Sequence, residues 1–125
     1  RATLAVQEPA GVIMYASPIN PCIEACGIQR IMKFHQRVER FEPYSSERDA
    51  FSAMLFGESV QLSLDTEGRV LLPPQLAQFA HLKEQVTIVG KGEIFELWEP
   101  KAFAEYIERM RKIVREKRSQ LKGDA

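Results

Sequence analysis

The chain has 125 residues, of which 45% are hydrophobic and 27% charged, so it favours one compact domain or two very small ones and excludes global disorder. Seventeen Lys and Arg residues balance seventeen Asp and Glu residues, so a uniformly basic coat is excluded and any polyanion site must be a local patch. There is no apolar run long enough to cross a bilayer and no secretory signal, and the two cysteines are too few for a disulfide framework. We therefore expect a soluble protein of a reducing, intracellular compartment.

The first half of the chain predicts two strands and two helices. Apolar runs at Val12 to Tyr15 and Ile23 to Cys26 are typical of strands, and a helix follows. The expected apolar face of that helix consists of Ile28, Ile31, Met32, His35, Val38 and Phe41. Pro43-Tyr44 then breaks the chain, and Ser46-x-x-Asp49 resembles a capping box that opens a short helix through Phe51 and Leu55.

The clearest local pattern begins at Ser59, where Val60, Leu62 and Leu64 alternate with polar residues as in a strand with one buried face. Asp65-Thr66-Glu67-Gly68 predicts a tight turn, because Asp accepts a nearby backbone hydrogen bond and Gly tolerates a positive φ. A second strand is expected over 69–72. Pro73-Pro74 ends it, since neither proline can donate to a ladder.

A short helix is expected around Leu76, Phe79, Ala80 and Leu82, followed by strands over 85–89 and 94–98 that are joined at Gly90-Lys91-Gly92. A longer helix begins at Pro100, and its apolar stripe consists of Phe103, Tyr106, Ile107, Met110, Ile113 and Val114. This stripe is longer than a small domain needs. We expect it to dock on the other half of the chain or on a neighbouring subunit.

The early part of the chain repeats the later part in order. Residues 12–15 match 86–89, residues 23–26 match 95–98, and a helix follows in both copies. The pattern predicts a duplicated unit of the βαββα kind. On this interpretation the strand, turn and strand that open the first copy belong upstream of Arg1, so we expect half of its opening motif to be missing from the chain.

Several short motifs occur in one order along almost the whole chain. They are Asn20-Pro21-Cys22-Ile23-Glu24, Ser46-Glu47-Arg48-Asp49-Ala50-Phe51, Gly57-Glu58-Ser59-Val60, Asp65-Thr66-Glu67-Gly68-Arg69-Val70 with Leu72-Pro73, Val89-Gly90-Lys91-Gly92 and Trp98-Glu99-Pro100. With these motifs the sequence resembles the SpoVT-AbrB family of swapped-hairpin DNA-binding domains, and more narrowly its two-copy bacterial members.

The resemblance implies an α+β fold of duplicated, pseudo-twofold swapped-hairpin β units with flanking helices. It divides the chain into a remainder of the first copy (1–30), connecting helices (31–57), a second copy (58–103) and a C-terminal helix and tail (104–125). It also implies a cytoplasmic, nucleoid-associated transcriptional repressor of a bacterial cell-division and cell-wall gene cluster that includes its own gene. Such a protein binds repeated operator boxes in double-stranded DNA as a ring-shaped homo-oligomer, without catalysis, cofactor, small-molecule substrate or membrane.

Arg69 is the expected reader of DNA, because a planar, permanently charged guanidinium fits a phosphate or the O6/N7 edge of guanine. Gly68 allows close backbone approach, and Asp65 ties the turn. Glu67 could accept from cytosine N4 or be solvated, and the second is favoured. Lys91 could reach phosphate or only decorate a turn, and again the second is favoured. The basic C-terminal stretch more often complements a helix dipole than contacts DNA.

Cys22 and Cys26 lie four residues apart without further Cys or His at metal-binding spacing, so we expect buried thiols and no metal site. His35, His81 and Trp98 are interpreted as structural. Two other classes stay open. The chain could be an antitoxin-like module whose amphipathic C-terminal helix binds a partner protein, although such tails are more often extended. It could also be a small thiol or metal protein that uses the two cysteines.

Overall fold

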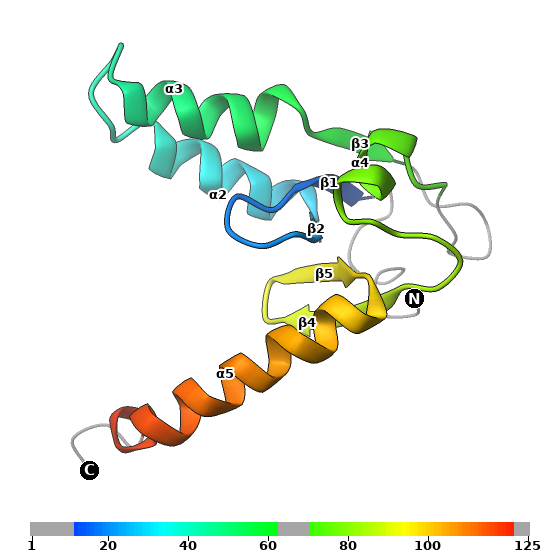
Figure 1. The fold of residues 1–125 in the computed structure, drawn as a ribbon. Helices are drawn as coiled ribbons and strands as arrows, with labels where there is room; N and C mark the ends of the chain where they lie inside the picture. The colour runs from blue at the N-terminus through cyan, green and yellow to red at the C-terminus, as the bar shows by residue number, and fades with distance from the viewer. Residues whose placement is uncertain (1–11, 63–70, 122–125) are drawn as a thin grey trace.

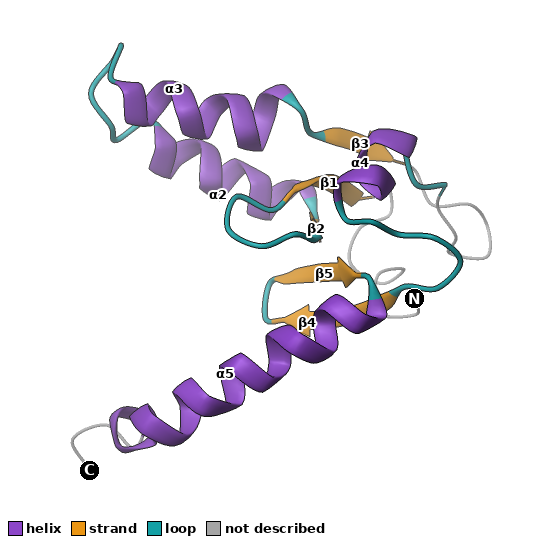
Figure 2. Ribbon diagram, viewed as in Figure 1, coloured by secondary structure: helices purple, strands orange, loops and turns teal. Residues whose placement is uncertain are grey.

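The structure, a computed structural model, describes residues 12–62 and 71–121. Its centre is a single antiparallel sheet with the strand order β3-β1-β2-β5-β4, in which every neighbouring pair is antiparallel. The strands are β1 (Val12–Ala16), β2 (Ile23–Cys26), β3 (Val60–Leu62), β4 (Thr87–Lys91) and β5 (Ile94–Trp98). Helical segments complete the fold (Figures 1 and 2). They are α2 (Ile28–Val38), α3 (Ser46–Ser52), the π-helical turn η1 (Ala53–Gly57), α4 (Pro74–Phe79) and α5 (Pro100–Leu121). The α+β class expected from the sequence is confirmed.

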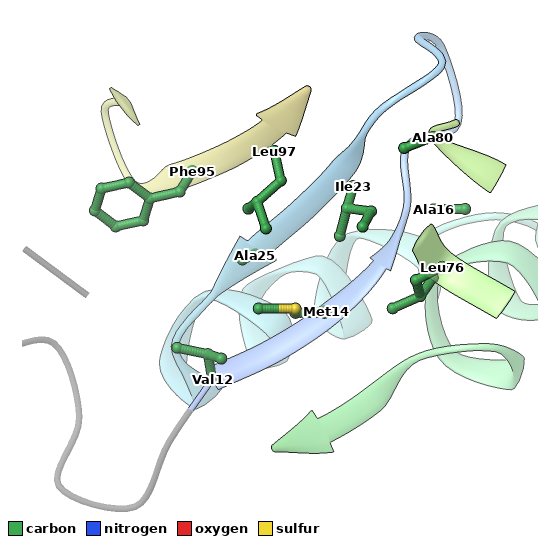
Figure 3. Packing of buried hydrophobic residues seen from close by; sticks show 9 residues of the cluster. All are labelled: Val12, Met14, Ala16, Ile23, Ala25, Leu76, Ala80, Phe95 and Leu97. Atoms are coloured by element: carbon green, nitrogen blue, oxygen red, sulfur yellow. The ribbon is translucent and has the colours of Figure 1, made fainter. Parts of the chain in front are cut away.

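One face of the sheet carries the larger apolar cluster. Figure 3 shows Met14, Ile23 and Leu97, from three neighbouring strands, on the side where Leu76 and Ala80 of the α4 segment approach. All members of this cluster are at most 7% exposed. Alternation of side chains along each strand sends every second residue into this cluster and the others to the opposite face.

The opposite face is covered by helices in two places. Ile31 and Val38 of α2, with Leu55 of η1, pack on Tyr15 and Cys26. Tyr106 of α5 packs on Trp98 and Cys22. The rings of Trp98 and Tyr106 lie with centroids 4.4 Å apart. The prediction that Trp98 is core is confirmed, since it is fully buried.

The two hairpins, β1–β2 and β4–β5, meet at a seam formed by β2 and β5. The seam pairs Ile23 with Leu97, Glu24 with Glu96 and Ala25 with Phe95. The repeat found in the sequence aligns Glu24 with Glu96, so this one equivalent pair stands at the centre of the seam, with the neighbouring equivalents crossed around it. One continuous hydrogen-bonded sheet therefore joins the two halves of the chain.

Three local expectations differ from the structure. The cap of α3 is Ser45 rather than Ser46, and its Oγ accepts a hydrogen bond from the Arg48 N–H at 3.1 Å. The β4–β5 turn is Gly92-Glu93, with Gly92 at φ 76°, so Lys91 is the last residue of β4 and pairs with Ile94. Leu71 and Leu72 are irregular rather than strand residues.

The buried face of α2 also differs from the expected stripe. Ile31 and Val38 are buried and Phe34 packs against them, but Met32 is 59% exposed and the His35 side chain is equally so. His35 therefore does not lie on the buried face. Its Nε2 is 3.1 Å from Glu39 Oε2, one turn along the helix.

Candidate nucleic-acid interface

The turn that the sequence analysis expects to contact DNA lies between β3 and α4 along the chain. Asp65, Glu67, Gly68 and Arg69 all lie outside the described residues. The described residues on either side are anchored: Leu62 pairs with Val12 at the edge of the sheet, and Leu76 of α4 is buried in the larger apolar cluster. Pro73 precedes α4 with φ −62°, as a proline ring requires, and Pro74 occupies the first turn.

Lys91 is the one predicted site residue that the structure describes. Its Nζ lies 3.0 Å from Glu96 Oε2, donates to the Tyr106 hydroxyl and sits 4.7 Å from the centroid of that ring. Burial disfavours the charged ammonium, but the hydrogen bonds to Tyr106 and Glu96 and the Glu96 charge together outweigh it, so the pKa of Lys91 is raised. Lys91 therefore ties β4 to α5, with a third of its side chain exposed.

Glu96 is buried but fully engaged. Besides Lys91, its carboxylate accepts a hydrogen bond from Trp98 Nε1 at 2.8 Å, and the residue is 1% exposed. The equivalent Glu24 of the first hairpin is 7% exposed and accepts from Ser17 Oγ at 2.8 Å. A buried carboxylate is tolerated only when it is paired or hydrogen-bonded. The two halves thus place a carboxylate at the same position but satisfy it with a cation in one hairpin and a hydroxyl in the other.

The distal part of α5 is the most basic surface that the structure describes. Every residue from Arg111 to Leu121 is exposed. The cations of this region are Arg109, Arg111, Lys112, Arg115, Lys117 and Arg118. Of these six cations, Arg111 alone has an acidic partner within 4 Å among the described residues, at 2.9 Å from Glu108. Figure 1 shows this end of the helix projecting beyond the sheet.

The two cysteines are free and fully buried. Burial, the largest cause, and the nearby Glu96 and Glu24 charges raise the pKa of the Cys22 thiol to about 12. Burial likewise raises the pKa of Cys26 to about 11. The prediction of buried thiols is confirmed. Within residues 12–62 and 71–121, no three His, Cys, Asp or Glu side chains lie together in a group that could hold a metal ion.

One open groove of about 740 Å³ lies between the end of α4 and the start of α5. It is lined by Lys83 and Lys101 but also by Glu84 and Glu99, so its charges cancel and it does not attract an anion. His81 is at its edge with φ 57°, a left-handed conformation that ends α4. In the described parts of the chain, no helix has the length and apolar character that crossing a bilayer requires.

These features define a class: a small α+β protein whose single antiparallel sheet joins two hairpins and the edge strand β3, with helices on both faces. The model of the family described as "MraZ protein, putative antitoxin-like" matches residues 55–123. The "Transcriptional regulator MraZ" of Rickettsia bellii (strain OSU 85-389) is 51% identical over 98% of this chain and 82% of its own length. Those of Rickettsia canadensis (strain McKiel) and Rickettsia felis are 52% identical over 98% of this chain and 83% of theirs. The chain belongs to the MraZ family, as the order of its motifs indicated.

Proposed function

We propose that this chain is a sequence-specific, DNA-binding transcriptional regulator that represses its own gene cluster. The observation that carries the proposal is the similarity, over 98% of the chain, to proteins named as transcriptional regulators. The proposed reader is Arg69, which follows the turn that the sequence predicts over Asp65 to Gly68, and the further candidate contacts are Asp65, Gly68, Glu67 and Lys91.

The proposed architecture is two swapped-hairpin copies related by a pseudo-twofold axis, with the boundaries 1–30, 31–57, 58–103 and 104–125. Two observations support it. Glu24 and Glu96, equivalent in the repeat, face each other at the β2–β5 seam. In addition, β3 of the proposed second copy pairs with β1 of the proposed first copy. Pairing between a strand of one copy and a strand of the other is what an exchange of strands between the copies would produce.

The proposed mechanism is multivalent. A chain with equal numbers of acidic and basic residues offers few contacts to DNA, so useful affinity requires several subunits on several boxes. A homo-oligomer, proposed to be a ring, makes each later contact intramolecular. This assembly would act at the nucleoid in the cytoplasm.

The test is a gel-shift titration of the full-length protein on repeated and scrambled boxes across a series of salt concentrations. We expect cooperative shifts that are specific for repeated boxes and weaken steeply with salt, since phosphate contacts release counterions. Equal shifts on both duplexes at every salt concentration would contradict sequence-specific binding.

A second candidate function is an antitoxin-like interaction with a partner protein, which the wording of the family description favours. The exposed distal part of α5 is the surface available for it. Against it, that segment is helical as far as Leu121, whereas a neutralising tail is more often extended. Co-expression with the neighbouring gene products, followed by purification at high salt, distinguishes the two candidate functions. Only an antitoxin is expected to co-purify with a stoichiometric protein partner.

A further inference from the structure

The positive charge of this chain is concentrated in one segment of α5. Six of the seventeen Lys and Arg residues lie in the ten residues from Arg109 to Arg118, which contain a single acidic residue, Glu116. The remaining 115 residues hold eleven basic and sixteen acidic residues, so the rest of the chain is acidic as a whole. A chain without net charge attracts a polyanion only through a local patch, and this segment is such a patch.

The helix dipole does not account for these cations. The favourable interaction of a cation with the dipole is confined to the last turn of a helix. Of the six cations, Arg118 alone lies in the last turn of α5, which ends at Leu121. The dipole interpretation that the sequence favoured therefore covers one cation, and the other five need a different explanation.

Three of the arginines form a row along one side of the helix. Arg111, Arg115 and Arg118 are spaced by four and three residues, so their side chains share a face. The row is about 10 Å long at 1.5 Å per residue, close to the axial rise of about three base pairs of duplex DNA. All three residues are exposed. By the same spacing, Tyr106, which packs on Trp98, lies on another side of the helix.

Contacts within the chain compete only weakly for this row. Arg111 is 2.9 Å from Glu108, but both side chains are more than half exposed, so the pair contributes little. Arg115 and Arg118 have no acidic side chain within 4 Å among residues 12–62 and 71–121. Because a guanidinium group presents paired N–H donors to phosphate oxygens, the row offers three phosphate-binding groups.

The composition of the segment favours a nucleic acid over an anionic membrane as the source of those phosphates. Helices that lie in a membrane interface carry Trp, Phe or Leu along a continuous apolar side. Residues 109–121 contain no aromatic residue and one Leu. Lys117 also interrupts their short apolar side, because it is spaced three or four residues from each of Ile113, Val114 and Leu121.

We propose that the row of Arg111, Arg115 and Arg118 binds the phosphate backbone of double-stranded DNA, outside the bases that the proposed turn contacts. This inference rests on the proposed function and adds to it a second contact that is independent of sequence. In Figure 1 the distal end of α5 lies away from β3 and α4, between which that turn falls along the chain. The row therefore adds affinity and orientation, and the choice of bases stays with the turn.

Fluorescence anisotropy on repeated and scrambled boxes of equal length, across a series of salt concentrations, tests the row. The variant is the full-length protein with Arg115→Gln and Arg118→Gln, since both sites are exposed and Gln is a good helix former. We expect its affinity for both duplexes to fall about tenfold or more at about 0.1 M salt, with the ratio of the two affinities unchanged. The plot of log affinity against log salt should become shallower by about 0.9 for each lost phosphate contact.

The matched control is Arg37→Gln with Arg40→Gln, at exposed residues in the last turn of α2 and just after it. It makes the same change of net charge away from α5, so we expect the affinity and the salt dependence of the unmodified chain. Equal losses in the two double variants would overturn the inference, because they would follow from net charge alone. A variant at Arg115 and Arg118 that keeps its DNA affinity but no longer binds phosphatidylglycerol vesicles would also overturn it, and would assign the row to a membrane.

Failure of this inference and failure of the proposed function give different results. Equal affinity for repeated and scrambled boxes, with a loss in the variant at Arg115 and Arg118, would overturn sequence-specific regulation and leave the phosphate contact intact. A preference for repeated boxes, with the same affinity and salt dependence in that variant as in the unmodified chain, would overturn the phosphate contact and leave the proposed function intact.

Discussion

Single side chains determine how this protein responds to pH. The thiols of Cys22 and Cys26 are buried, and their pKa values are raised in the folded state. As the pH rises, the unfolded chain therefore loses its thiol protons at a lower pH than the folded protein does. Unfolded thiols ionise near pH ~8.5. The stability contribution of the neutral thiols is therefore fully present below about pH 8.5 and is lost as pH rises toward 11 or 12.

We expect Cys22→Ala to flatten this alkaline loss. Between pH ~9 and ~11, each protected thiol contributes a slope of about 1.4 kcal/mol per pH unit to the free energy of unfolding, and the variant lacks one of the two. Urea unfolding at several pH values measures it. Tyrosines and lysines titrate in the same range, so the comparison is between the slopes of the two chains. Identical slopes would mean that Cys22 ionises equally in both states.

Arg69 carries the proposed recognition of bases. Replacing it by Ala should leave the melting temperature unchanged and lower operator affinity by about 1–3 kcal/mol, the range for one good bidentate contact to guanine. Fluorescence anisotropy at fixed salt on a multi-box operator measures the loss. Arg40→Ala, at an exposed residue after α2, serves as the control of equal charge. If both variants bind as the unmodified chain does, Arg69 is not the reader.

At the scale of elements, capping decides where the α2–α3 hairpin reverses. Pro43 and Tyr44 form the break, with Tyr44 fully exposed at φ 68°, and Ser45 then caps α3. Ser45→Ala should destabilise the protein by about 1 kcal/mol, because the Arg48 N–H loses its acceptor. Ser46→Ala is the matched control: Ser46 lies inside α3, and Ala is a good helix former. Thermal unfolding of both variants decides between the two serines, and an equal loss would contradict the assignment.

Elements with strong periodicity were predictable from the sequence, and their partners were not. Hairpin strands at residues 23–26 and 94–98 and the helix from Pro100 agree closely with the structure. The register of the β2–β5 seam depends on contacts between residues some 70 positions apart, which local patterns do not encode. Helix α2 buries Ile31 and Val38, with Phe34 partly buried beside them, and leaves Met32 and His35 exposed, because packing against the sheet and η1 sets its orientation. Lys91 is the only candidate site residue within the described part of the chain. No pattern in the sequence predicts its ion pair with Glu96.

At the scale of the whole molecule, the proposed recognition of DNA requires assembly. The full sequence has no net charge, so one subunit lacks the broad positive field that holds a monomer on DNA. We expect affinity to rise about 100-fold or more when a second operator box is added at the natural spacing, because the second contact is intramolecular. Titrations on one-box and two-box duplexes measure this. A gain of only twofold, the statistical factor for two independent sites, would contradict multivalent binding.

The seam between β2 and β5 would also constrain the proposed DNA recognition. Two DNA-contacting units joined by a flexible tether could follow half-sites at many separations, whereas units carried by the two halves of one hydrogen-bonded sheet would keep a fixed angle and distance. Inserting a single base pair rotates the far half-site by about 35° around the duplex axis. Binding by a regulator built in this way would therefore depend on the rotational position of one half-site relative to the other. Inserting or deleting one base pair between the half-sites would weaken binding, although the contacted bases stay the same.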